Sequence, residues 1–287
     1  MRVAAVQLTP ELDPAENLAK MRARAAEAAA LGARVVVFPE QTLVLLSSVT
    51  PERLTELARD WWEPFASLAA ELAVEHGITV IAPGFEPAPS TGSAPDELPF
   101  NTIIAYGPDG SELARYRKLH LYKAFAASET EHTQAGDELP PVIDVVCEGE
   151  NGPERIRFGL ANCYDVRFPE VFRHLVDQGA QAFLLAAAWA SGPGKEAHWS
   201  LLTRARALEN VSWLVASATV GGGERGSATA GLSAVVDPLG NVVAALGPRG
   251  EGVLVADIDA GAVDRARAEL PALENRRIAL GYEVTPG

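Results

Sequence analysis

The sequence contains little cysteine and little histidine. Of its 287 residues only two are cysteine, Cys147 and Cys163, and only five are histidine. Two cysteines in so long a chain do not make the disulfide framework of a small secreted domain, so the sequence predicts reduced thiols and a cytoplasmic protein. No pair of histidines has a metal-ligand spacing. The sequence therefore predicts no metal site and no cofactor.

Long apolar runs and an excess of positive charge are also missing. The longest obvious apolar run, residues 183–190, falls far short of the roughly 20 residues of a membrane span. The apolar amino terminus is interrupted at Gln7, too early for a signal peptide. With 38 acidic and 24 basic residues the formal net charge is -14, which argues against a nucleic acid or an anionic membrane as partner. The expected partner is a small molecule.

Apolar residues are abundant: they make up 48% of the sequence, which is enough for a large core. The length fits one large domain or two ordinary ones. No stretch has the composition of a linker between domains. The sequence therefore predicts a single domain over residues 1–287.

Short β-type runs alternate with helical runs in the first part of the chain. The expected strands cover residues 3–8, 34–38 and 78–83, and the expected helices lie between them, over 13–32 and 50–77. Asp13 suits an N-cap and Pro14 the first helical position. This order predicts a layered α/β core with helices covering a sheet.

The middle and the end of the chain repeat this plan with hairpins added. One hairpin is expected over residues 101–117, around Gly-Pro-Asp-Gly, and another over 230–246, around Asp-Pro-Leu-Gly. Further strands are expected over 142–146, 156–161, 182–187 and 213–218, with helices over 169–178 and 195–210. The two similar halves favour a sandwich of two sheets with helices outside. A segment rich in proline and serine, residues 87–99, reads as a surface loop.

Three residues with different chemistry lie just past the end of a β-type run: Glu40, Lys118 and Cys163. Strand ends are where α/β folds place ligands, so we expect the three side chains to converge. Glu40, as a buried carboxylate with a raised pKa, would take the thiol proton. Lys118 would favour the thiolate and stabilise an oxyanion, with the backbone amide of Tyr164 as second donor. Such a site needs no histidine.

Other interpretations remain open for the same residues. A lone cysteine is most often a core residue, Glu40 alone would be a solvated carboxylate, and Lys118 alone would be a charge on an edge strand. A papain-like hydrolase with His174 or His198 as base is the enzymatic alternative. A binding or scaffold protein without activity is another. Cys147 is expected to be a structural or surface thiol, and His132 a solvated side chain.

Three windows of the sequence together resemble the nitrilase superfamily, also called the carbon–nitrogen hydrolases. These windows are Val-Phe-Pro-Glu at 37–40, Tyr-Arg-Lys-Leu-His-Leu at 116–121, and Gly-Leu-Ala-Asn-Cys-Tyr-Asp-Val-Arg-Phe-Pro-Glu at 159–170. They are similar to the family's base, lysine and cysteine signatures, in the same order and with typical separations. Residues 101–102, 204–210 and 236–240 agree as well, so the resemblance covers nearly the whole chain.

The resemblance implies a fold and roles for individual residues. The fold would be a four-layer α-β-β-α sandwich with two mixed sheets, and chains would pair into homodimers or larger homo-oligomers. Glu40 would be the general base, Lys118 the oxyanion-stabilising cation and Cys163 the nucleophile that forms an acyl-thioester. The family's second glutamate could be Glu129 or Glu131. Glu129 is favoured, because it lies seven residues before a glycine that matches Gly136.

The residues around the cysteine indicate a branch of the family. Cys-Tyr-Asp-Val-Arg-Phe-Pro-Glu at 163–170 resembles the amidase branch that includes ω-amidase and deaminated glutathione amidase, whereas true nitrilases usually carry Cys-Trp-Glu. The resemblance thus implies hydrolysis of a small carboxylic-acid amide by water, with N-carbamoyl or nitrile hydrolysis as alternatives. Arg167 or Arg173 could bind a substrate carboxylate. Arg167 could instead brace the turn by pairing with Glu170 or Asp165, and Trp189 could wall the pocket or lie in the core.

Overall fold

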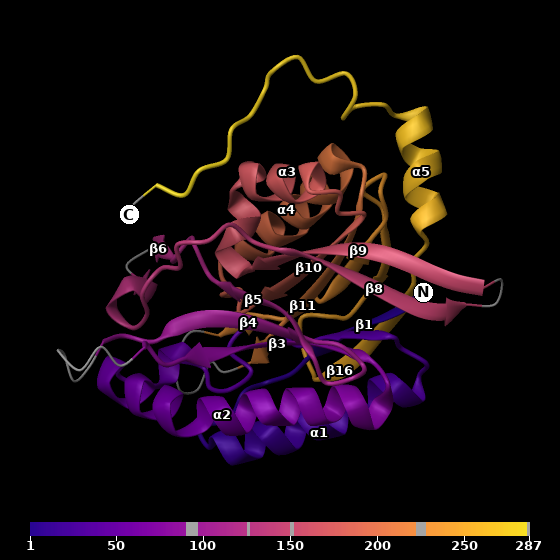
Figure 1. Cartoon of the computed structure of the whole chain (residues 1–287). Helices are drawn as coiled ribbons and strands as arrows, with labels where there is room; N and C mark the ends of the chain where they lie inside the picture. The colour runs from indigo at the N-terminus through magenta and orange to yellow at the C-terminus, as the bar shows by residue number, and fades with distance from the viewer. Residues whose placement is uncertain (90–96, 125–126, 150–151, 222–227, 286–287) are drawn as a thin grey trace.

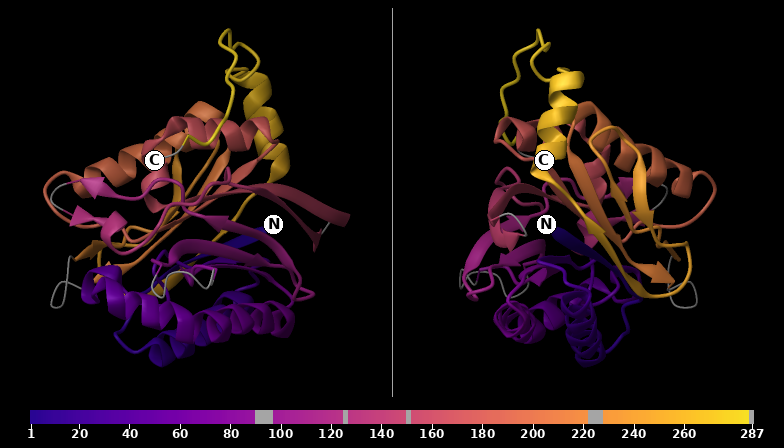
Figure 2. Two further views of the ribbon diagram at one scale, coloured as in Figure 1. Left: turned by 60° about the vertical axis from the view of Figure 1, so that its left-hand side comes forward. Right: turned by 90° about the vertical axis from the view of Figure 1, so that its right-hand side faces the viewer.

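Two mixed sheets lie face to face between layers of helices, and together they form an α-β-β-α sandwich (Figures 1 and 2). The structure is a computed structural model that describes residues 1–89, 97–124, 127–149, 152–221 and 228–285. This is the fold that the sequence predicted. No helix in these ranges is long and apolar enough to cross a bilayer.

The first sheet has six strands, five of which come from the first half of the chain. In spatial order its strands are β16 (Gly252–Asp257), β1 (Arg2–Gln7), β2 (Val35–Val37), β3 (Thr79–Glu86), β4 (Phe100–Tyr106) and β5 (Glu112–Arg117). Its outer face is covered by α1 (Pro14–Ala30) and α2 (Pro51–His76) (Figure 1). The predicted cap of α1 is confirmed, because the Asp13 carboxylate accepts from the amide of Ala15 and Pro14 opens the helix.

The second sheet also has six strands. In spatial order these are β15 (Val242–Ala245), β14 (Ala234–Val236), β11 (Trp213–Ala218), β10 (Ala182–Ala187), β9 (Gly152–Asn162) and β8 (Val142–Gly149). Helices α3 (Pro169–Asp177) and α4 (Lys195–Asn210) cover its outer face (Figure 1). Helix α5 (Ala260–Glu269) packs where β10 and β11 begin, since Arg267 donates to the carbonyls of Ala180 and Val211.

Three apolar layers hold the sandwich together, and β1 shows how one strand serves two of them. Val3 and Ala5 face the other sheet, whereas Ala4 and Val6 face the helices. Successive side chains of a strand point to opposite faces, so a strand buried on both faces needs an unbroken apolar run. Complete burial stabilises each valine by about 1.5–3 kcal/mol.

The carboxyl-terminal part departs from the prediction in three places. The expected strand 230–236 is split into β13 (Thr229–Ala230) and β14, because the backbone between them turns through a left-handed Leu232 (φ 61°). Strand β16 and helix α5 were not predicted; β16 is fixed by antiparallel pairing with β1 at the opposite end of the chain.

Residues 90–96 of the expected surface loop lie outside the described residues.

Candidate active site

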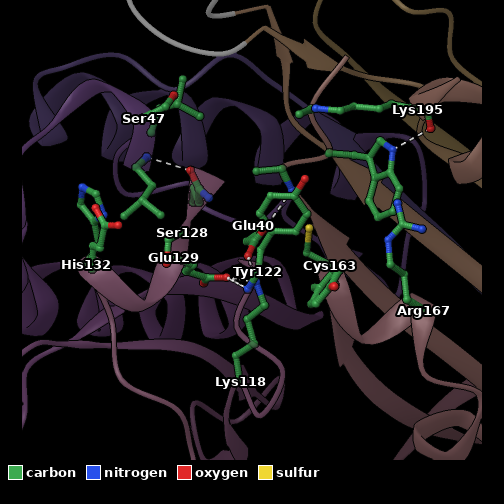
Figure 3. Close-up of a pocket in the computed structure, with 18 residues that line it drawn as sticks. Glu40, Ser47, Lys118, Tyr122, Ser128, Glu129, His132, Cys163, Arg167 and Lys195 are labelled. Carbon is green, nitrogen blue, oxygen red and sulfur yellow. Dashed lines mark hydrogen bonds and ion pairs between the residues drawn. The ribbon is translucent and has the colours of Figure 1, made fainter. Parts of the chain in front are cut away.

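Glu40, Lys118 and Cys163 meet at the carboxyl ends of their strands, as the sequence predicted (Figure 3). Glu40 follows β2 and Lys118 follows β5, both in the first sheet, whereas Cys163 follows β9 in the second. The three strand ends therefore come from both sheets of the sandwich. All three side chains line one cavity of about 340 Å³.

Lys118 lies between two carboxylates. Its ammonium donates to Glu40 Oε1 and to Glu129 Oε2, each at 2.8 Å. The amide of Asn101 bridges the same pair of carboxylates, donating to each of them at 2.8 Å. Lys118, Glu40 and Asn101 are 1% exposed and Glu129 5%. Glu131 is exposed, so the geometry places Glu129 rather than Glu131 beside the lysine.

This pair of carboxylates keeps Lys118 charged. Burial by itself lowers the pKa of the ammonium, but the charges of Glu129 and Glu40 outweigh burial and raise its pKa well above the ordinary value. Buried charges persist where opposite charges and hydrogen bonds compensate for the lost water. The site therefore contains a fixed, water-excluded cation at neutral pH.

Glu40 is the common acceptor of the site. Its Oε1 accepts from Lys118 and Asn101, and its Oε2 accepts from the amide of Ala188 at 2.8 Å; the Cys163 thiol also hydrogen-bonds to this carboxylate. Burial raises the pKa of Glu40, but the Lys118 charge and these hydrogen bonds lower it below the ordinary value. The predicted raised pKa was wrong, because the sequence could not show how many donors surround the carboxylate.

Cys163 begins a short 3-10 turn, η3 (Cys163–Arg167), with a left-handed backbone (φ 46°). Its thiol is almost completely buried. Burial and the Glu40 carboxylate raise the pKa of the thiol well above its ordinary value, and Lys118 only partly opposes them. Lys118 thus favours the thiolate, as expected, but the expectation that it brings the pKa of the thiol below its ordinary value is wrong, because burial and Glu40 outweigh it. At rest the site pairs a neutral thiol with an ionised carboxylate.

Hydrogen bonds to the Asp165 side chain hold the η3 turn in place. This fully buried carboxylate accepts from the amide of Asn162 (2.9 Å), from the Tyr116 hydroxyl (2.8 Å) and from His120 Nδ1 (2.8 Å). Sequence reasoning missed this role of Tyr116 and His120. The signal was present, because both residues flank Lys118 within the lysine signature.

Backbone hydrogen bonds to two other segments fix the position of Lys118. The amide of Lys118 donates to the carbonyl of Asn101, and its carbonyl accepts from the amide of Gly136, both at 2.9 Å. A side chain at Gly136 would collide with the backbone of Arg117. The glycine is therefore required by this close approach.

Arg167 stands at one end of the cavity, with its guanidinium 4.7 Å from the ring centre of Trp189. No ion pair joins it to a described acidic residue, and the carboxylate of Asp165 is already occupied. The bracing role considered for Arg167 was therefore wrong, and Arg173 does not line the cavity. Trp189 is both buried and part of the wall, and its indole N–H donates to the carbonyl of Lys195.

Neither of the two histidines considered as a papain-like base lies in the cavity. His174 lies on α3 and donates to the carbonyl of Pro140, and His198 is exposed on α4; neither lines the cavity. The papain-like arrangement is thus absent among the described residues. His132 was expected to be solvated, but it lines the cavity and its Nε2 donates to the carbonyl of Val49 (3.3 Å). Cys147 is half-buried near the end of β8.

Comparison with known proteins agrees with this fold and site. A family model of the carbon–nitrogen hydrolases matches residues 2–268. The chain belongs to this family and is a carbon–nitrogen hydrolase.

Its relatives include several proteins that are named amidases. A Mycobacterium tuberculosis protein named a hydrolase is 40% identical over 96% of this chain and 95% of its own. The deaminated glutathione amidase of Synechocystis sp. is 32% identical over 95% and 97% of the two chains. Among solved structures, the NitFhit protein of C. elegans is 31% identical with a TM-score of 0.84, and the match covers 96% of this chain but 65% of that one.

A second solved structure is more informative about chemistry. An amidase from Nesterenkonia sp. is 29% identical, with a TM-score of 0.76 and coverage of 96% of both chains. One variant of that amidase, in which a glutamate is replaced by glutamine, shows the result of Michael addition of acrylamide at its active-site cysteine.

Proposed function

We propose that this carbon–nitrogen hydrolase is an amidase that releases ammonia from the amide of a small carboxylic acid through an acyl-thioester on Cys163. The observation that carries the proposal is the Glu40 carboxylate, which contacts both the Cys163 thiol and the Lys118 ammonium. A base, a nucleophile and a fixed cation around one cavity are the parts that acyl transfer needs.

In the first half of the reaction, the Cys163 sulfur attacks the amide carbon while Glu40 takes the thiol proton. Because the resting thiol is neutral, proton transfer accompanies the attack. The negative charge that develops on the carbonyl oxygen is stabilised by the Lys118 ammonium and the backbone amide of Tyr164. The C–N bond then breaks, Glu40 returns the proton to the leaving nitrogen, and an acyl-thioester remains.

In the second half, water attacks the thioester carbon and Glu40 takes a proton from the water. The same oxyanion donors stabilise the second tetrahedral intermediate. Its collapse breaks the C–S bond, releases the carboxylic acid and returns the proton to the Cys163 sulfur. Glu129 does not exchange a proton in this scheme; it holds the Lys118 ammonium in place.

The walls of the cavity support an acid amide as substrate. Arg167 and Lys195 line the same end of it (Figure 3). Trp189 contacts both, because the Arg167 guanidinium lies over its ring and its indole N–H donates to the carbonyl of Lys195. A guanidinium at a partly buried site is suited to a carboxylate. Several relatives are named deaminated glutathione amidase, which supports an acidic acyl portion.

The test is an ammonia-release screen over ω-amido acids, neutral primary amides, carbamoyl amines and nitriles. The expected result is turnover of ω-amido acids that disappears in Cys163→Ala. Ammonia from nitriles alone, or from carbamoyl amines alone, would move the enzyme to another branch of the family. Absence of turnover from every class would favour a protein that has kept the fold for binding.

We also propose that the chain forms homodimers. Leu201 and Leu208 lie on α4, which covers the outside of the second sheet, and are 66% and 43% exposed. Exposed leucines on one helix support an apolar contact between chains. Light scattering on the purified protein tests this, with a monomer as the contrary result.

A further inference from the structure

A chain of hydrogen bonds joins the residue before the nucleophile to the two buried carboxylates of the site. Asn162 is the last residue of β9, and its Nδ2 donates to Asn101 Oδ1 at 3.0 Å. Asn101 Nδ2 in turn donates to Glu40 Oε1 and to Glu129 Oε1. Both asparagines are buried and neither lines the cavity. The reaction scheme above gives Asn162 no role.

The direction of this chain of hydrogen bonds is set by its acidic end. Ionised carboxylates accept hydrogen bonds and have no hydrogen to donate, so Asn101 Nδ2 must face both of them. The Asn101 oxygen is then turned away from the carboxylates and needs a donor of its own. Asn162 Nδ2 supplies that donor. The carboxylates therefore fix which atom of each amide faces which partner.

Loss of the donor at Asn162 would remove the reason for this orientation. The Asn101 oxygen would be left buried without a partner, which is costly. Rotation of the Asn101 amide by half a turn would not repair this, because its oxygen would then face the oxygens of Glu40 and Glu129. Either arrangement weakens the hydrogen bond to Glu40, the carboxylate that contacts the Cys163 thiol.

Asn162 is well placed to hold Asn101, because its own backbone is fixed. Its amide N–H donates to Asp165 Oδ2 at 2.9 Å, and within the second sheet it lies opposite Ala186 of β10. Asn101 belongs to β4 in the first sheet. The hydrogen bond between the two side chains therefore crosses from one sheet to the other. It relates the segment that carries the nucleophile to the strand that supports the base.

We propose that Asn162 is a positioning residue of the active site, whose amide fixes the Asn101 side chain in the orientation that donates to both buried carboxylates. Asn162 contacts neither the substrate nor the reacting atoms and acts only through Asn101. The inference rests on the proposed function for the role of Glu40 as the base and goes beyond it.

The experiment measures kcat and KM for an ω-amido acid from pH 4 to 9 in the parent and in Asn162→Leu, which has a similar volume and no donor. We expect kcat to fall about tenfold with little change in KM, because a displaced base slows the chemical step. The acid limb of kcat/KM reports the ionisation of Glu40 in the free enzyme. It should move up by about 0.5–1 pH unit, the size of one lost hydrogen bond.

A second substitution at the same position covers the case in which leucine prevents folding. Asn162→Ser has a shorter side chain and is expected to move the acid limb in the same direction. The Asn101→Ala background then tests whether Asn162 acts through Asn101. In that background the group to be positioned is missing, so adding either substitution should leave the acid limb where Asn101→Ala alone puts it.

Asn210→Leu is the matched control for the loss of a buried asparagine. Asn210 is fully buried, donates to the carbonyl of Arg206 within α4 and does not line the cavity. Its replacement should lower the melting temperature and leave the acid limb of kcat/KM unchanged. A shift of the limb in Asn210→Leu as large as that in Asn162→Leu would reduce Asn162 to a structural role.

The remaining outcomes separate the positioning role from the proposed chemistry. An acid limb that stays in place in the Asn162 variants, or that moves equally far in the Asn101→Ala background, overturns the positioning role and leaves the amidase function standing. If no amide is turned over, modification of Cys163 by methyl methanethiosulfonate is followed against pH, with Cys147→Ser as common background.

This modification reports on Glu40 without any turnover. The Glu40 charge raises the pKa of the Cys163 thiol, so the plot of modification rate against pH changes slope where Glu40 ionises. A change of slope at higher pH in Asn162→Leu than in the parent supports the positioning role even if the protein is not an amidase. A change of slope at the same pH overturns it.

Discussion

His120 Nδ1 and Asp165 Oδ1 lie 2.8 Å apart, and this hydrogen bond joins the two signature segments of the site. His120 is two residues from Lys118, and Asp165 is two residues from Cys163. The imidazole also stacks on Phe168, with ring centres 3.7 Å apart. The hydrogen bond therefore helps to fix where Lys118 lies relative to Cys163. His120 itself does not line the cavity.

Loss of this hydrogen bond is expected to affect catalysis more than binding. His120→Ala should lower kcat about 10- to 100-fold with little change in KM, because small displacements of reacting groups are costly. His120→Asn keeps a donor near the position of Nδ1 and should recover most of the rate. His174→Ala is the control, a buried histidine outside the cavity that should change the melting temperature and not kcat. An unchanged kcat in His120→Ala would refute the positioning role.

Glu40→Gln should lower turnover and raise the intrinsic reactivity of the thiol. Turnover should fall by about 10²- to 10⁴-fold, the usual contribution of a general base. The Glu40 charge raises the pKa of Cys163, so its removal should lower that pKa while Lys118 remains charged. Methyl methanethiosulfonate should therefore modify Cys163 faster at pH 7 in Glu40→Gln than in the parent, with Cys147→Ser as common background. Slower modification would contradict the electrostatics described above.

Lys118→Met should destabilise the protein as well as inactivate it. The change leaves Glu40 and Glu129 buried without their shared cation, and breaking a buried ion pair in this way costs about 3–5 kcal/mol. Urea denaturation measures the loss in unfolding free energy. Adding Glu129→Gln to Lys118→Met should recover part of the loss, because one uncompensated charge is removed. Equal stability of Lys118→Met and the parent would show that the ion pairs are not coupled to folding.

The pKa shifts of Glu40 and Lys118 determine how the stability of the protein depends on pH. The pKa of Glu40 is lowered on folding, so its contribution is present above its ordinary value of 4.5 and is lost as the pH falls through the folded value. The pKa of Lys118 is raised, so its contribution is complete below 10.5 and is lost as the pH rises through the folded value. The unfolding free energies of the parent and of Lys118→Met, measured from pH 3 to 11, should differ most between these limits. A difference that is constant over the whole range would contradict the shifts.

Arg167→Gln should separate charged from neutral substrates. A hydrogen bond to a charged group is worth about 1.5–3 kcal/mol, so kcat/KM for an ω-amido acid should fall roughly 10- to 100-fold. For a neutral primary amide of similar size the change should be small. Arg173→Gln is the matched control, because Arg173 lies on α3 and does not line the cavity. Equal losses for both substrates would assign Arg167 to packing against Trp189.

The contrast between predictable and unpredictable features is clearest in the strands. Central strands such as β10 and β11 are almost entirely apolar and buried on both faces, and the sequence predicted both at their observed bounds. Helix α4 was predicted over 195–210, as observed. Strand β16 is only half-buried and depends on pairing with β1 some 250 residues away. Local pattern carries no information about so distant a partner.

The sequence by itself determined the type of fold and which three side chains follow the strand ends that meet in the site. It could do so because burial periodicity and signature residues are local properties of the chain. Only the tertiary structure decided the protonation of the site and the direction in which Arg167 faces, whereas its placement of Glu129 beside Lys118 agrees with the preference drawn from the sequence. Each of these depends on burial and on charges contributed by segments far apart in the chain. For that reason Glu40, predicted to have a raised pKa, has a lowered one beside Lys118, and Cys163 remains a thiol until a substrate is attacked.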